Sequence, residues 1–160
     1  MNPASVGDDD ALEPAGYFIV RNDNGAPTLP LTNLGSVLLQ KATVPLETAG
    51  SPGQDNPAGL IRPINVALDA SGLGSALGPN DQLLLFNNAQ AGFNKSASAI
   101  YYFDTQWRLL GDGTASDRGG DLIPQGAGFI IRRVDGVSAL WTNSFPVAAL
   151  SAVSRKLHGG

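Results

Sequence analysis

Short apolar runs, many of them alternating with polar residues, are separated by clusters of glycine, proline, asparagine and aspartate along this chain. Such segments predict β-strands bounded by turns, and no segment keeps a helical period for three turns. The predicted strands are residues 17–22, 28–34, 37–46, 60–68, 82–86, 99–103, 106–110, 128–134 and 138–145. The pattern predicts an all-β fold, an antiparallel β-barrel or sandwich of about nine short strands.

The segments between these strands divide into loops and turns. Residues 49–59 (AGSPGQDNPAG) have the composition of a surface loop, and residues 73–77 predict one helical turn. A hairpin is predicted through Asp104-Thr105, and a second one through Asp135-Gly136, which is the strongest local turn signal in the chain.

One strand–turn–strand unit occurs at both ends of the chain. Residues 15–22 (AGYFIVRN) return as residues 126–133 (GAGFIIRR), and Asn24-Gly25 matches Asp135-Gly136. The residues assigned to this repeated structural motif are Gly16, Phe18, Arg21, Gly128, Phe129, Arg132 and Trp141. The two hairpins are expected to lie side by side or to be related by a pseudo-twofold axis. Alternatively, the N-terminal hairpin completes the fold of a neighbouring subunit.

Composition limits the classes of function. The chain has 160 residues, of which 42% are hydrophobic and 15% are charged, so it is long and apolar enough to form one folded domain. The absence of cysteine excludes disulfides and thiolate chemistry. A net charge of −4 without a basic stripe argues against nucleic acid as a partner. No apolar run reaches the ~20 residues of a membrane-spanning helix, so membrane insertion is not expected.

The same survey suggests a division of the chain. Residues 1–13 form an acidic arm, residues 14–150 a single β domain, and residues 151–160 a tail that is either native or partly a cloning remnant. A basic region followed by an apolar stretch is missing from the start, so no signal peptide is predicted.

Candidate catalytic residues are few. The only histidine is His158 in the tail, which leaves no basis for a Ser-His-Asp triad. Asp112, Asp117 and Asp121 lie in a glycine-rich loop (GDGTASDRGGD), where carboxylates on flexible backbone could bind calcium or serve a carboxylate-based hydrolase. The spacing fits no defined calcium loop, and Arg118 lies among the carboxylates, so a solvated turn is the preferred interpretation. No cofactor is predicted apart from this candidate calcium.

Aromatic residues offer a candidate binding surface. In the strand 99–103, Tyr101 and Phe103 share one face and Tyr102 takes the other. An exposed platform of Tyr102 and Trp107 could stack on a sugar or anchor a protein partner. Packing between neighbouring strands is the usual role of such residues and is the alternative.

The order of motifs resembles a family of exported, β-rich bacterial proteins of unknown function. The residues that carry the resemblance are the strand DQLLLFN at 81–87, the pair AIYYF…QWR at 99–108, PQGAGFIIR at 124–132 and LWTN at 140–143. The N-terminal PAGYFIVRN at 14–22 resembles the end of a preceding unit of the same family. The resemblance implies an extracellular or cell-surface location and carries over no catalytic residue.

These observations favour a non-enzymatic protein. The first hypothesis is a self-assembling β-rich subunit of a surface appendage or layer, or a viral coat or decoration protein, with copies of itself or other subunits as partners. A carbohydrate-binding or adhesive surface module, with a glycan as ligand, is the alternative. A hydrolase that uses Asp112, Asp117 and Asp121 is the third.

Overall fold

The computed structural model describes residues 41–60, 62–87, 89–90, 94–113, 116–134 and 136–143. Within them the chain forms nine strands and two short 3-10 helices. The strands are β1 (Ala42–Leu46), β2 (Gln54–Gly59), β3 (Val66–Ala67), β4 (Gln82–Leu85), β5 (Ala99–Phe103), β6 (Trp107–Leu109), β7 (Leu122–Ile123), β8 (Gly128–Arg133) and β9 (Ala139–Asn143). The 3-10 helices are η1 (Leu68–Ser71) and η2 (Leu73–Ser75). None of the described helices has the length and apolar character needed to cross a bilayer.

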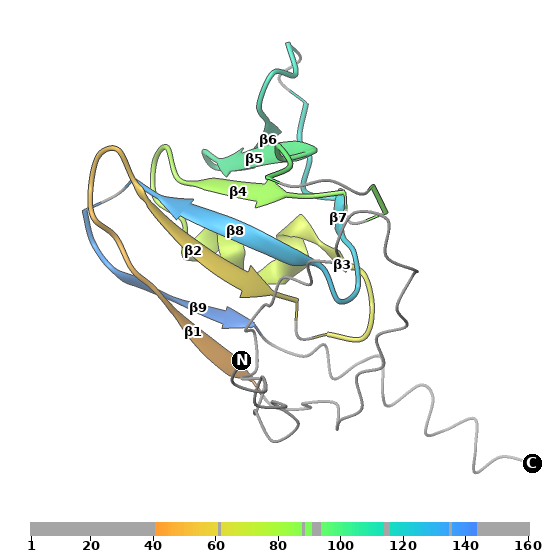
Figure 1. Ribbon diagram of the computed structural model, residues 1–160, viewed down its shortest axis with the longest axis horizontal. Helices are drawn as coiled ribbons and strands as arrows, with labels where there is room; N and C mark the ends of the chain where they lie inside the picture. The colour runs from red at the N-terminus through yellow and green to blue at the C-terminus, as the bar shows by residue number, and fades with distance from the viewer. Residues whose placement is uncertain are drawn as a thin grey trace, which may run out of the picture.

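The strands form one antiparallel sheet of five and two smaller pairs. The order of the large sheet is β2-β8-β4-β5-β6, whereas β1 pairs with β9 and β3 pairs with β7. The five strands stack in that order in Figure 1, and the 3-10 helices lie behind them. The prediction of an all-β antiparallel fold is confirmed. The three sheets do not close into a barrel over the described residues.

The predicted hairpin between β8 and β9 is wrong. β8 pairs with β2 and β4, and β9 pairs with β1, so the chain passes from one sheet to another at residues 134–138. The connection from β1 to β2 changes sheets in the same way, and both corners lie at the left of Figure 1. The Asp-Gly signal indicates only a local reversal of the chain. It does not decide which strands pair, and both edges of β8 are already hydrogen-bonded, one to β2 and the other to β4. The hairpin of β5 and β6 is confirmed.

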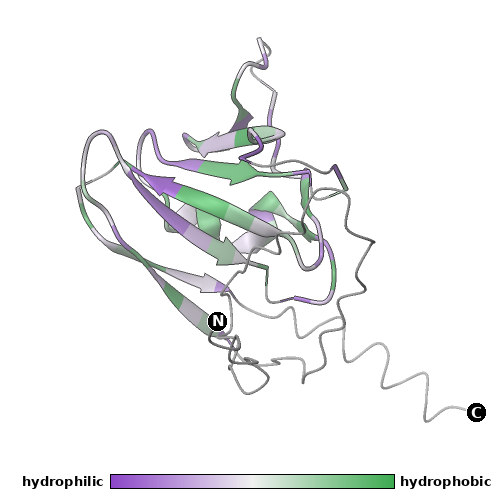
Figure 2. Ribbon diagram, viewed as in Figure 1, coloured by the Kyte–Doolittle hydropathy of each residue, from purple (hydrophilic) through white to green (hydrophobic). Residues whose placement is uncertain are grey.

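The predicted loop at residues 49–59 is also corrected, because its second half is strand β2. β2 is hydrophilic over most of its length (Figure 2), and its Pro57 suits an edge strand. The Asn56 side chain fastens the corner to β1: its Oδ1 accepts from the Glu47 amide at 2.7 Å, and its Nδ2 donates to the Glu47 carbonyl at 2.9 Å. At this bend the amide side chain of Asn56 therefore takes up the backbone N–H and C=O of Glu47, as a neighbouring strand would do.

The remaining strand predictions are confirmed only in part. The predicted strand at residues 60–68 shrinks to β3, and the following residues form η1. The predicted helical turn at 73–77 corresponds to η2. The strands predicted at 17–22 and 28–34 lie outside the described residues.

The core lies between the large sheet, the β1–β9 pair and the 3-10 helices. β8 shows the alternation expected of a sheet with one buried face, with Phe129, Ile131 and Arg133 directed inward. Figure 2 shows the apolar middle of β8 beside the equally apolar β4. The buried cluster comprises Leu46, Ala58, Leu60, Val66, Leu68, Leu73, Ala76, Leu83, Leu85, Tyr101, Trp107, Ile123, Ala127, Phe129, Ile131 and Trp141.

Candidate functional site

The three aspartates predicted as a calcium loop are directed to three different partners. Asp112 forms an ion pair with Arg118, Asp117 accepts from the Gly119 amide at 3.0 Å, and Asp121 accepts from the Tyr101 hydroxyl at 3.0 Å. No group of three acidic or histidine side chains that could hold a metal occurs in the described part of the chain. The structure therefore does not bring the three carboxylates together as ligands.

These interactions fix the loop and tune its ionisable groups. Burial, followed by the bond to Asp121, raises the pKa of Tyr101 to about 12. The hydrogen bond from Arg118 to Asp112 raises the pKa of that guanidinium. The Arg118 amide also donates to the Trp107 carbonyl at 2.9 Å. The bonds from Tyr101 to Asp121 and from the Arg118 amide to Trp107 tie the loop to β5 and β6, and the Arg118–Asp112 pair holds the loop to itself; all three are structural roles.

The predicted aromatic platform is wrong because Trp107 is 1% exposed. Trp107 lies directly opposite Phe103 in the β5–β6 pair, so both side chains share the inner face. Their rings make an edge-to-face contact with centroids 5.5 Å apart. Tyr102 lies opposite Arg108 on the other face and is half-buried.

The C-terminal copy of the repeated motif has packing roles. Gly128 pairs with Gly59 of β2, and Phe129 makes an edge-to-face contact with Trp141 at 5.7 Å between ring centroids. Trp141 is fully buried, and its Nε1 donates to the Ser71 carbonyl at 2.9 Å. Arg132 makes two hydrogen bonds to Asp55, at 2.7 and 2.9 Å. The N-terminal members Gly16, Phe18 and Arg21 lie outside the described residues.

A buried ion pair at the corner between β8 and β9 was not predicted. Asp81 is fully buried, with its Oδ2 3.3 Å from Arg133 Nε, and Arg133 is 2% exposed. Asp81 also accepts from the Val134 amide at 2.6 Å and the Gly78 amide at 2.8 Å. Arg133 donates to the carbonyls of Ala76 and Val137. The sequence held a signal for this pair, because the period of two places Arg133 on the same face as Phe129 and Ile131.

Apolar side chains are exposed on the β1–β9 pair. Leu140 is 67% exposed and lies directly opposite Pro45, which is also exposed. Val137, in the corner that precedes β9, is 69% exposed. The two-stranded β1–β9 sheet is called the ribbon below, and Pro45, Val137 and Leu140 are called the outer ribbon face. Val137 and Leu140 are the two most exposed of the large hydrophobic side chains in the described residues.

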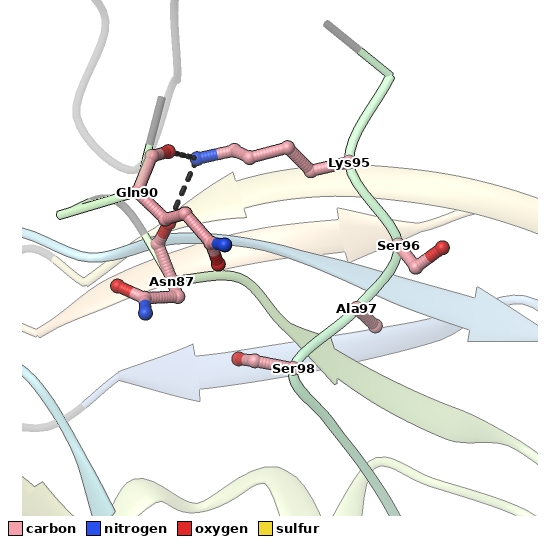
Figure 3. A pocket seen from close by; sticks show the side chains of 6 residues that line it. All are labelled: Asn87, Gln90, Lys95, Ser96, Ala97 and Ser98. Carbon is pink, nitrogen blue, oxygen red and sulfur yellow. Dashed lines mark hydrogen bonds between the residues drawn. The ribbon is translucent and has the colours of Figure 1, made fainter. Parts of the chain in front are cut away.

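A polar hollow of about 340 Å³ lies beside the connection between β4 and β5. Figure 3 shows its lining of amide and hydroxyl side chains around Lys95, whose Nζ donates to the carbonyls of Asn87 and Gln90 at 2.7 and 2.8 Å. The lining residues are Asn87, Gln90, Lys95, Ser96, Ala97 and Ser98. Amides and hydroxyls suit a polar ligand, but the lysine is already occupied by backbone acceptors.

Comparisons of this chain with protein-family models, with curated proteins and with solved structures find no match.

Proposed function

We propose that the protein is a non-enzymatic structural or interaction protein that assembles with copies of itself, as a subunit of a surface appendage or layer or of a viral coat. The outer ribbon face carries this proposal. Leu140 and Pro45 are opposite each other, so their side chains form one apolar surface rather than two isolated exposed residues. Burying such a surface between subunits would contribute about 25 cal/mol per Å² of apolar area.

The contact is expected to use this face rather than the strand edges. The outer strands of the five-stranded sheet and of the β1–β9 pair each have a feature that hinders strand addition. Pro45 in β1 and Pro57 in β2 lack an amide donor, and the carbonyl of Trp107 in β6 already accepts from the loop. On β9, the Thr142 carbonyl lies against Gly72. Face-to-face contact between ribbons avoids all four obstacles.

The test is assembly of the purified chain at increasing concentration, followed by negative-stain electron microscopy and sedimentation velocity. We expect filaments, rings or sheets from the native chain and loss of assembly in Leu140→Ser. Leu110→Ser is the matched control, because Leu110 is 54% exposed but follows β6, away from the ribbon. A native chain that stays monomeric, or equal effects of the two substitutions, would refute the proposal.

The polar hollow favours a second candidate, a carbohydrate-binding module. Its amide and hydroxyl lining offers both donors and acceptors to sugar hydroxyls. A thermal-shift screen against a glycan panel tests this idea, with Asn87→Ala as the variant that should lose the response. A glycan that stabilises both chains equally would place its binding elsewhere.

A further inference from the structure

The exposed side of β1 carries one charge of each sign, one at each end of the ribbon. Lys41 directly precedes β1, and Glu47 directly follows it. The period of two places Lys41, Thr43, Pro45 and Glu47 on the same side of the strand, and all four are exposed. At about 3.3 Å per residue the two charges are about 20 Å apart. Pro45 and its neighbour Leu140 therefore lie between a positive end and a negative end.

Both charges are available to another molecule. Within the described part of the chain, the ion pairs join arginines to aspartates and include neither Lys41 nor Glu47. The Glu47 carboxylate accepts a hydrogen bond from the Ser138 hydroxyl at 3.4 Å, which places it beside the start of β9. The carboxylate thus keeps its position on the ribbon, and its charge has no positive partner among the described residues.

The order of the two charges selects the orientation of a second copy. A face that binds the same face of another copy forms a two-fold contact. In an antiparallel contact of β1 with β1, Lys41 of each copy meets Glu47 of the other, whereas a parallel contact brings like charges together. β9 has no charged residue, so a contact of β1 with β9 leaves both charges unpaired. Because opposite charges fix the register of an interface and like charges oppose it, complementarity selects the antiparallel contact of β1 with β1.

We propose that the outer ribbon faces of two copies bind each other in an antiparallel two-fold contact, with Lys41 of each copy paired with Glu47 of the other. This inference rests on the proposed self-assembly through the outer ribbon face, and it adds the orientation and the residues that set it. The contact joins copies in pairs, because one neighbour occupies the whole face. Larger assemblies of the native chain then grow from these pairs through other surfaces.

Charge reversal on the full chain tests the orientation. Lys41→Glu makes both ends of β1 negative, and Glu47→Lys makes both ends positive. Each variant alone is expected to raise the dissociation constant of the pair by about tenfold or more, as measured by sedimentation velocity. Mixed in equal amounts, the two variants should pair with each other within about threefold of the native affinity, because every negative end then meets a positive one. No recovery in the mixture would overturn the proposal.

Two further variants separate the pairing from a change in net charge. Asp104→Lys changes the net charge as Glu47→Lys does, but Asp104 lies in the turn between β5 and β6, away from the ribbon in Figure 1. It should leave the dissociation constant unchanged, and an effect equal to that of Glu47→Lys would overturn the proposal. The double variant Lys41→Glu/Glu47→Lys exchanges the two charges and should pair with itself as the native chain does. Loss of pairing in this double variant would also overturn the proposal.

The orientation of the contact can fail while the face itself stands. If Leu140→Ser prevents pairing but both reversed variants pair like the native chain, the outer ribbon face is the contact and the antiparallel orientation is overturned. A native chain that stays monomeric overturns the orientation together with the proposed assembly.

Discussion

The five-stranded sheet and the β1–β9 ribbon share one core, but they differ in how their charges and outer surfaces are satisfied. In the sheet, the buried Arg133 has Asp81 as partner, and Arg132 on the outer face pairs with Asp55. In the ribbon, the buried Asn143 accepts a hydrogen bond from Arg62 of the β2–β3 connection, and the outer face presents Leu140.

The two regions differ in their exposed apolar surface and in the partner of their buried polar groups. The sheet places Asp81 opposite the charge of the buried Arg133, although the Arg133 Nε makes no hydrogen bond. The ribbon keeps the unused Asn143 Nδ2 at one end and exposed apolar side chains on one face. The exposed apolar side chains of the ribbon are therefore where we propose that contacts with other subunits form.

The largest expected effect removes the charge partner inside the sheet. Asp81→Ala should lower the free energy of unfolding by about 3–5 kcal/mol, because Arg133 is then buried without an opposite charge. Urea unfolding measures the change. Asp104→Ala is the control, since the partly exposed pair with Arg108 is worth about 0.2–1 kcal/mol. If Asp81→Ala lowered the free energy of unfolding by less than about 1 kcal/mol, the buried pair of Arg133 would be worth no more than the partly exposed pair of Arg108.

The joint between the ribbon and the core is tested next. Gly72 has φ +75°, and a Cβ there would lie 2.8 Å from the Thr142 carbonyl oxygen on β9. Gly72→Ala should therefore cost about 2–3 kcal/mol, from left-handed strain and from displacement of β9. Gly111→Ala measures the cost of the left-handed backbone alone, because Gly111 has φ +85° and no atom near the position of a Cβ. Equal losses of stability in the two variants would show that contact with β9 contributes nothing.

A smaller effect concerns alkaline pH at the β5 side of the sheet. The pKa of Tyr101 is about 12 in the fold and 10 in the unfolded chain, so the unfolded state loses its proton first. The contribution of this group to stability is complete below pH 10 and is lost as pH rises toward 12. Tyr101→Phe should remove that part of the decline in Tm, while Tyr102→Phe should retain it. An unchanged alkaline profile in Tyr101→Phe would contradict the assignment.

The smallest effect is expected on the outer face of the sheet. Arg132→Ala should cost about 0.2–1 kcal/mol, since both side chains of this pair are about 40% exposed. Arg132 lowers the pKa of Asp55 below 3.8, mainly through the hydrogen bonds, so the contribution is present above that pH and is lost on further acidification. Unfolding in high salt should shrink the difference between variant and native chain.

The sequence predicted the elements whose signals are local and missed those decided by distant partners. β4, β5, β6 and β8 follow from their apolar or alternating segments of strand length, and the β5–β6 turn from the turn residues Asp104-Thr105, although the connection has three residues. β2 could not be predicted, because QDNPAG becomes a strand only where β8 offers an edge.

The same limit applies to the candidate site. Trp107 was placed on the wrong face because the register across the β5–β6 turn pairs it with Phe103. The aspartates of the glycine-rich loop were recognised as charged groups in a turn, but their individual partners depend on β5 and on Arg118. Arg62 carries no sequence signal, because its hydrogen-bond partner Asn143 lies 81 residues away in the chain.

The pairing of Ala42 with Asn143 has a mechanical consequence. The described fold is entered and left through two antiparallel strands that end side by side, so tension applied to residues 41 and 143 would load the β1–β9 hydrogen bonds one after another. Such unzipping needs less force than shearing a whole ladder at once. A pull on the chain would open the ribbon first, and the five-stranded sheet would yield only when the bends held by Asn56 and Asp81 failed.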